Sequence, residues 1–333
     1  MKFNTLPKTD LSVSQLCFGC WGVASDFHWG DRIEDESVQA MLAAVDAGVN
    51  FFDTAPVYGD GASETLLGRV LADNNLRAKT VIASKVRPDR MKPEDIQTGC
   101  EESLKRLQTD YLDLYQTHWS NREIPLADTW TAMLKLQEQG KVRHIGVSNM
   151  GGADMAAVSP LKTPVTNQLP YNLLWRMIEA TILPQCVQDD IGVLVYSPLM
   201  HGMLADKYQK AADVPDGRAR SRHFRTEREL ARHGEPGCEA ETFAALDGLR
   251  TIAAETNRSM ADLALTWTIQ QPGIISVIAG ARNAEQLREN VRCLEHPLDQ
   301  GIIDQMNRAT EELKTALGPN PDMWDGGDNS RYR

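Results

Sequence analysis

Polar and ionisable residues follow several short apolar runs of this chain. Asp53 follows VNFF, Lys85 follows TVIAS and His118 follows YLDLYQT, while Tyr58 lies in DTAPVYGDGAS, just after the first run. A phenol has an ordinary pKa near 10, too high for a well-matched acid at neutral pH, and a nearby ammonium lowers that pKa. We therefore expect a proton-transfer site in which Tyr58 donates the proton, Lys85 tunes it and Asp53 orients Lys85.

The chemistry that fits these groups is proton donation beside hydride transfer to a carbonyl. His118 would donate a hydrogen bond to the carbonyl oxygen, where negative charge develops. The residues suggest no metal site, because the strand-end His, Cys and acidic residues do not resemble a metal-binding triad. A hydrolase using His118 and Asp53 is an alternative, but it lacks a nucleophile or a metal set.

The elements that must position these residues alternate along the chain. We expect strands at 16–19, 49–53, 80–85, 111–118, 142–147, 165–168, 193–196 and 275–278. Helices are expected at 36–47, 64–72, 93–107, 126–139, 153–158, 178–189, 260–270 and 284–291. Strands that alternate with helices indicate parallel pairing, and this many units without a composition break favour a single (β/α)8 TIM barrel over residues 1–333. A Rossmann sheet would need a Gly-x-Gly-x-x-Gly turn after its first strand, which is missing here.

In such a barrel, the residues that end the strands meet at one mouth. Ser148 and Asn149 end the fifth expected strand, Gln168 the sixth, and Tyr196 and Ser197 the seventh. Residues 2–6 and 11–13 flank a turn and predict an N-terminal β-hairpin that covers the barrel floor. The polar insertion 206–237 carries eight Lys and Arg residues, and is either a mobile surface loop or a lid over an anionic ligand.

Composition excludes several classes of function. The 333 residues carry a formal net charge of -11, which argues against a nucleic-acid footprint. No secretory signal or long apolar run is evident, so we expect a cytoplasmic protein without a membrane segment. Cys17 and Cys20 form a CxxC pair, but they lie in an expected strand, which favours a structural role over a redox or zinc site. The sequence does not indicate an oligomeric state.

Several segments together resemble the aldo-keto reductase family along nearly the whole chain. They are DTAPVYGDGASETLLG, IASKV, YLDLYQTH, KVRHIGVSN, VTNQLPYN, VYSPLMHGML and IAGARNAEQLREN. The resemblance implies a (β/α)8 barrel that binds a nicotinamide cofactor, usually NADPH rather than NADH. It also implies a catalytic tetrad of Asp53, Tyr58, Lys85 and His118. The segment WGVASDFHWGD is similar to bacterial sugar- or inositol-related reductases.

The resemblance assigns the cofactor residues one by one. Ser148, Asn149 and Gln168 match residues that hydrogen-bond the nicotinamide carboxamide, and Tyr196 matches the aromatic residue that stacks beneath the ring. The pyrophosphate turn is matched by Ser197, Leu199 and Gly202. The segment that grips the adenosine 2'-phosphate and adenine is matched by Gly280, Arg282, Gln286 and Asn290. The family also implies that the insertion folds over the cofactor, with Arg218, Arg220 and Arg222 as candidate phosphate contacts.

The substrate is expected to be a small carbonyl compound or a sugar. Aromatic residues that could wall its pocket are Trp21, Phe27, His28, Trp29 and Trp119, with Met323 and Trp324 reaching it from near the end of the sequence. Such rings suit apolar aldehydes as well as the faces of sugars. Because some relatives of the family are cytoplasmic β subunits of potassium channels, a cofactor-binding regulatory subunit is the alternative function.

Overall fold

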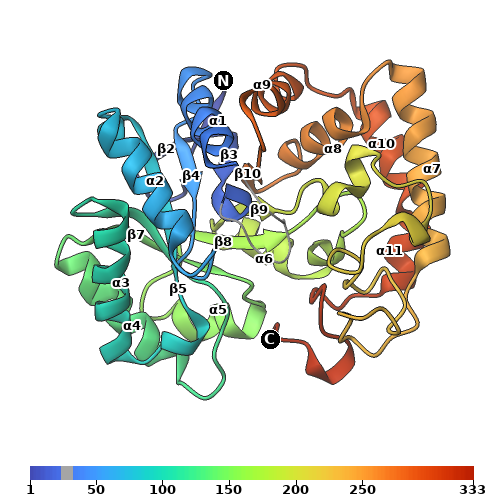
Figure 1. Cartoon of the computed structure of the whole chain (residues 1–333). Coiled ribbons are helices and arrows are strands. Elements are labelled where there is room, and N and C mark those ends of the chain that lie inside the picture. Colours follow the sequence, from blue (N-terminus) through green and yellow to red (C-terminus); the bar gives the residue numbers. More distant parts are fainter. Residues whose placement is uncertain (24–32) are drawn as a thin grey trace.

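Eight parallel strands close into a barrel, as the sequence predicts. A computed structural model describes residues 1–23 and 33–333, with the strands in the order β10-β3-β4-β5-β6-β7-β8-β9 (Figure 1). The barrel strands are β3 (Leu16–Gly19), β4 (Phe51–Asp53), β5 (Val81–Val86), β6 (Leu112–Thr117), β7 (Val142–Ser148), β8 (Thr166–Pro170), β9 (Gly192–Tyr196) and β10 (Ile274–Ala279).

Helices connect these strands and form the outer layer. They are α1 (Glu34–Asp46), α2 (Ala62–Asp73), α3 (Pro93–Leu107), α4 (Leu126–Glu138), α5 (Gly152–Val158), α6 (Ile182–Gln188), α8 (Met260–Ile269) and α9 (Ala284–Cys293). The expected helix at 178–189 is shorter than predicted, because a 3-10 turn at Met177–Ala180 precedes α6. None of the helices in the described part of the chain is long and apolar enough to cross a membrane.

The alternation of side chains along each strand separates two apolar cores. Phe51 of β4 packs in the barrel interior, whereas the next residue, Phe52, packs in the layer between strands and helices. Val81 and Ala83 of β5 likewise belong to the interior core. Since side chains of a strand point to opposite faces with a period of two, Asp53 and Lys85 share the inward face with these apolar residues.

A β-hairpin closes one end of the barrel interior. Strands β1 (Phe3–Thr5) and β2 (Ser12–Ser14) pair antiparallel, which confirms the predicted hairpin. Leu6, Leu11 and Val13 from this hairpin pack in the same core as the interior residues of the barrel. The interior is therefore filled from below with apolar side chains, and the polar strand ends face the opposite mouth.

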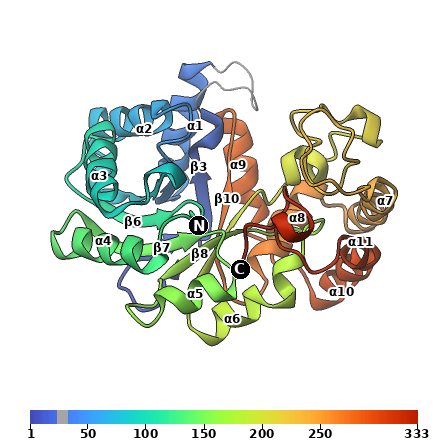
Figure 2. The same ribbon diagram turned by 90° about the horizontal axis from the view of Figure 1, so that it is seen from below.

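Three helices were not predicted from the sequence. They are α7 (Glu239–Thr256), α10 (Gln300–Ala309) and α11 (Glu311–Leu317). They lie together on one side of the barrel, outside the regular strand–helix units (Figures 1 and 2). Neither α10 nor α11 directly follows a barrel strand, so the alternation of strands and helices did not reveal them.

The insertion 206–237 is not a solvated loop throughout. Its residues Ser221–Phe224 are buried, and His223 hydrogen-bonds through Nε2 to the carbonyl oxygen of Leu174 at 2.9 Å. Arg222 donates to the carbonyl oxygens of Leu317 and Asn320, at 2.7 and 2.9 Å, and pairs with Glu235. These contacts attach the insertion to the barrel and to the segment after α11.

Candidate active site

A buried ion pair lies at the carboxyl ends of β4 and β5. Lys85 Nζ donates to both carboxylate oxygens of Asp53, at 2.9 and 2.8 Å, and to the carbonyl oxygen of Thr54 at 2.9 Å. The Lys85 side chain is fully buried. Burial lowers the pKa of the Lys85 ammonium, but Asp53 and Tyr58 more than offset this, and the net pKa is raised above its ordinary value. Lys85 is therefore a fixed positive charge inside the barrel mouth.

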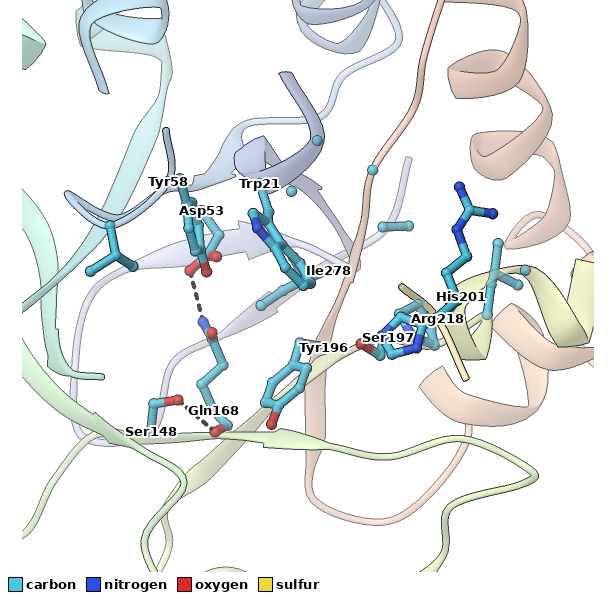
Figure 3. A pocket seen from close by; sticks show the side chains of 18 of the residues that line it. Trp21, Asp53, Tyr58, Ser148, Gln168, Tyr196, Ser197, His201, Arg218 and Ile278 are labelled. Atoms are coloured by element: carbon cyan, nitrogen blue, oxygen red, sulfur yellow. Dashed lines mark hydrogen bonds between the residues drawn. The ribbon is translucent and has the colours of Figure 1, made fainter. Parts of the chain in front are cut away.

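Tyr58 meets this charge from the loop after β4. Its hydroxyl lies 3.2 Å from Lys85 Nζ, and its ring lies beside that of Trp21, with centroids 6.1 Å apart (Figure 3). The loop turns through Gly59 and Gly61, whose φ values of 58° and 90° favour glycine, and α2 begins at Ala62. This turn returns Tyr58 over the strand end instead of carrying it into solvent.

The pKa of Tyr58 differs from the sequence-based expectation. Burial raises the pKa of Tyr58 to about 12, although the Lys85 ammonium opposes this effect. The prediction that the pKa of Tyr58 is lowered is therefore wrong for the protein without cofactor. Desolvation of the phenolate outweighs the attraction of one ammonium that already has a carboxylate partner. Tyr58 is protonated at neutral pH and is ready to donate.

His118 faces Tyr58 across the cavity. The two rings meet edge to face, with centroids 5.8 Å apart. Burial, followed by the nearby charge of Lys85, holds the pKa of His118 well below its ordinary value. Its Nδ1 is buried, and no described residue hydrogen-bonds to it. Neutral His118 can donate a hydrogen bond through Nε2, while Tyr58 remains the group with a proton to transfer.

Amide and hydroxyl groups surround the ion pair on the side of β7 and β8. Gln168 Nε2 donates to Asp53 Oδ1 at 2.7 Å, and Ser148 Oγ donates to the carbonyl oxygen of Gln168 at 2.9 Å (Figure 3). Asn149, the next residue, hydrogen-bonds through its side chain to Ser148, His118 and Tyr196. The residues expected to contact the carboxamide thus form one connected hydrogen-bond network with Asp53.

These residues line a cavity of about 720 Å³ that extends across the barrel mouth. Tyr196 lies between the Asp53 cluster at one end and His201 and Arg218 at the other (Figure 3). The turn after β9 contains positive φ values at Met200, His201 and Gly202, of 41°, 53° and 101°. Successive backbone N–H groups in such conformations can form an anion-binding concavity. Ser197 and Leu199 of this turn also line the cavity.

The segment before α9 forms the far end of the cavity. Gly280, Arg282 and Gln286 line it, and the Gln286 side chain accepts a hydrogen bond from the backbone of Arg282 at 2.9 Å. Asn283 caps α9 through its side chain. Asn290 is not among the residues that line the cavity; its amide donates to the carbonyl oxygen of Gly280 at 3.4 Å and supports this segment from behind.

The other expected residues divide into those at the cavity and those away from it. Trp21, Trp119, Trp324, Arg218 and Arg220 line the cavity. Arg222 does not, because its guanidinium is held by the buried contacts of the insertion. Trp29, with Phe27 and His28, lies outside the described residues, and Met323 is buried in the core next to Trp324.

Sequence reasoning missed several residues that line the cavity. Lys207, Arg232 and Arg331 line it, and Tyr332 lies behind it with its hydroxyl on Asn149 Oδ1. Lys207 and Arg232 belong to the basic insertion, where charge alone did not separate them from solvated neighbours. Nothing in the local sequence around Arg331 and Tyr332 indicates that this segment returns to the barrel mouth.

Comparison with known proteins identifies the family. The Aldo/keto reductase family model matches residues 15–311. The chain belongs to the aldo-keto reductase family.

Relatives in the family carry different descriptions. An aldo-keto reductase of Bacillus subtilis, YhdN, is 32% identical over 86% of this chain and 87% of its own. An NADH-specific methylglyoxal reductase of Escherichia coli is 30% identical over 94% of this chain and 100% of its own. A probable voltage-gated potassium channel subunit beta of rice, Oryza sativa, is 31% identical over 89% of this chain and 92% of its own.

Solved structures agree with the fold. A glycerol dehydrogenase of Gluconobacter oxydans superimposes with a TM-score of 0.79 at 28% identity, covering 96% of this chain and 97% of that one. An aldo-keto reductase of Klebsiella pneumoniae, solved in complex with NADPH, gives a TM-score of 0.71 at 29% identity, with coverage of 92% and 95%. This aldo-keto reductase is thus a (β/α)8 barrel in a family of oxidoreductases that use NAD(P)H.

The site predicts an unusual titration of His118. The pKa of His118 in the folded protein lies below its unfolded value of about 6.5. Neutral His118 therefore contributes to the free energy of unfolding above about pH 6.5, and this contribution is lost as the pH falls through the folded pKa. The imidazole signals of His118 in an NMR titration should stay unchanged between about pH 8 and about pH 6. A midpoint near 6.5 would show that the ring is solvated, and would remove the basis for its neutral donor role.

Proposed function

We propose that this protein is an NADP(H)-dependent aldo-keto reductase that reduces aldehydes or ketones, or oxidises sugar hemiacetals and polyols. The observation that carries the proposal is the Lys85 ammonium, fully buried and bonded to Asp53, Thr54 and the Tyr58 hydroxyl at a cavity mouth. Burying a charge pair is costly, and a site that only bound a ligand would not need this pair against a phenol.

The donor groups around the cavity fit a nicotinamide dinucleotide. Ser148 and Gln168 present hydroxyl and amide groups at the catalytic end, Tyr196 supplies a flat ring, and Arg218, Arg220 and Arg282 supply positive charge farther along. The carboxamide, the nicotinamide ring and the phosphates of such a cofactor would meet these groups in that order. When bound, the reduced nicotinamide supplies the hydride for carbonyl reduction.

Protein groups would handle the proton and the developing charge. A carbonyl oxygen placed between Tyr58 and His118 would accept a hydrogen bond from each, and Tyr58 would pass its proton to that oxygen as negative charge grows there. The phenolate left behind would lie 3.2 Å from the Lys85 ammonium, which stabilises it. Asp53 keeps that ammonium in place with two hydrogen bonds.

This chemistry favours an enzyme over the alternative, a regulatory β subunit of a potassium channel. The proton donor, its charged partner and a neutral histidine converge on the same cavity, although binding of a cofactor alone would require none of them. We therefore propose catalysis as the function. Trp21 and Trp119, which line the cavity, would contact a small carbonyl compound or the face of a sugar.

The preference for NADPH rests on the positive residues of the cavity. Arg282 precedes the amino terminus of α9, where backbone N–H groups and the helix dipole favour a phosphate. Arg218 and Arg220 reach the cavity from the insertion 206–237, which we propose covers the pyrophosphate. The relatives include a protein named as NADH-specific and a structure in complex with NADPH.

Replacement of Tyr58 by Phe tests the proton donor. Tyr58→Phe removes the hydroxyl and keeps the ring contacts with Trp21 and His118, so the carbonyl-reduction rate should fall by about 10²–10⁴-fold. NADPH affinity, measured by tryptophan fluorescence, should be nearly unchanged. Tyr111→Phe, at the opposite end of the barrel before β6, should retain full activity. Full activity of Tyr58→Phe would rule out its role as the acid.

Replacement of Arg282 by Ala tests the 2'-phosphate contact. Because a charge-assisted bond to phosphate would be lost, NADPH affinity should fall roughly tenfold or more, while NADH affinity should change little. Arg288→Ala on the exposed face of α9 is the matched control and should alter neither. An equal loss for both cofactors would reject the assignment of Arg282 to the 2'-phosphate.

A further inference from the structure

The side-chain amide of Asn149 uses its full hydrogen-bonding capacity inside the protein. Its Oδ1 accepts from the hydroxyls of Tyr196 and Tyr332, both at 2.8 Å. Its Nδ2 donates to the carbonyl oxygen of His118 at 3.0 Å and to Ser148 Oγ at 2.9 Å. An amide offers two donor hydrogens and two acceptor lone pairs, so all four are used within the protein.

The orientation of this amide follows from its partners. The carbonyl oxygen of His118 can only accept a hydrogen bond, so it must face the NH2 group of Asn149. Oδ1 then faces the two phenols, which must act as donors. Burial raises the pKa of Tyr196 and of Tyr332 above the ordinary value, so both hydroxyls keep the proton that they donate.

We propose that Tyr332 is a positioning residue of the active site, whose hydroxyl completes an Asn149-centred hub that fixes the Tyr196 ring and the His118 backbone. In this arrangement Asn149 acts as the hub that connects these groups. The inference rests on the proposed function, because the Tyr196 ring matters as the surface on which the nicotinamide would stack.

On one side of Tyr332, a buried carboxylate fixes the preceding residue, Arg331. Asp322 is fully buried and accepts from the backbone N, Nε and a terminal nitrogen of Arg331, at 2.9, 2.8 and 2.7 Å. The Arg331 guanidinium lies 3.5 Å from the centroid of the Trp119 ring, and the Tyr332 ring meets the same indole edge to face at 5.8 Å. The segment 318–333 thus packs against the residue that follows His118.

The start of α5 holds the segment on the other side of Tyr332. The backbone N–H groups of Ala153 and Asp154 donate to the carbonyl oxygen of Arg333, at 2.9 and 3.3 Å. Gly151 permits this approach, because a Cβ atom there would lie 2.2 Å from that oxygen. Figure 1 shows the end of the chain beside α5. Tyr332 is therefore fixed between two anchors, with its hydroxyl directed at Asn149.

The test compares two buried tyrosines that each lose only a hydroxyl. Tyr332→Phe should weaken NADPH binding by roughly two- to tenfold, because the Tyr196 platform loses support. Tyr171→Phe is the matched control, since its buried side chain donates to Glu179 at 2.7 Å and does not line the cavity. Both variants should lower the unfolding midpoint by about 2 °C, but Tyr171→Phe should bind NADPH as the parent does. Equal NADPH affinities of the two variants would overturn the proposal.

A double-mutant cycle tests the hub without cofactor. In an Asn149→Ala background, Tyr332→Phe should cause no further shift of the unfolding midpoint, because its acceptor has gone. The same shift in both backgrounds would contradict the hub. If Asn149→Ala does not fold, Tyr196→Phe takes its place in the cycle. The double variant Tyr196→Phe/Tyr332→Phe leaves Asn149 Oδ1 without a donor, so its unfolding midpoint should fall by more than the sum of the two single shifts. Additive shifts would overturn the hub.

These readouts separate the hub from the proposed function. A parent protein that binds neither NADPH nor NADH would refute the proposed function, while the cycle in the cofactor-free protein would still decide whether Tyr332 and Asn149 are coupled. Cofactor binding with an additive cycle would leave the function intact and reject the hub.

Discussion

The buried ion pair of Lys85 and Asp53 is the constraint on which the site depends. Two full charges have left water at the barrel mouth, and their mutual hydrogen bonds must offset a large desolvation cost. The pair is stable only if its remaining bonds are also made, and Thr54, Tyr58 and Gln168 make them. The same requirement that satisfies the charges therefore places a phenol beside an ammonium, which is the arrangement that proton donation needs.

The barrel explains why these groups can be held so closely. Inward side chains of β4 and β5 are apolar below the rim, and the hairpin fills the floor, so water does not reach the charges from beneath. Around the rim, Asn149 joins the His118 backbone to the Tyr196 ring, and the segment 318–333 closes this network through Tyr332. Positioning is thus distributed over β4–β9 and over a segment far from them in the sequence.

The sequence predicted the parts that follow from local periodicity. Alternating side chains and parallel strands force Asp53, Lys85, Gln168 and Tyr196 to one mouth, and the helix expected at 93–107 has the observed bounds of α3. The net pKa of Tyr58 was not predictable, because it depends on how completely the loop buries the phenol. Nor was the contact of Tyr332 with Asn149, 183 residues away, since only the path of the whole chain brings them together. Helix α7 was missed because it follows an insertion that interrupts the repeating pattern.

The free energy of unfolding of Lys85→Met, compared with that of the double variant Asp53→Asn/Lys85→Met, tests the central role of the ion pair most directly. The single variant leaves Asp53 buried without its cation and should lose about 3–5 kcal/mol. The double variant should recover much of that loss, because no unpaired charge remains, while Lys141→Met at the exposed pair with Glu101 should change little. A double variant as unstable as the sum of Lys85→Met and Asp53→Asn would contradict the account.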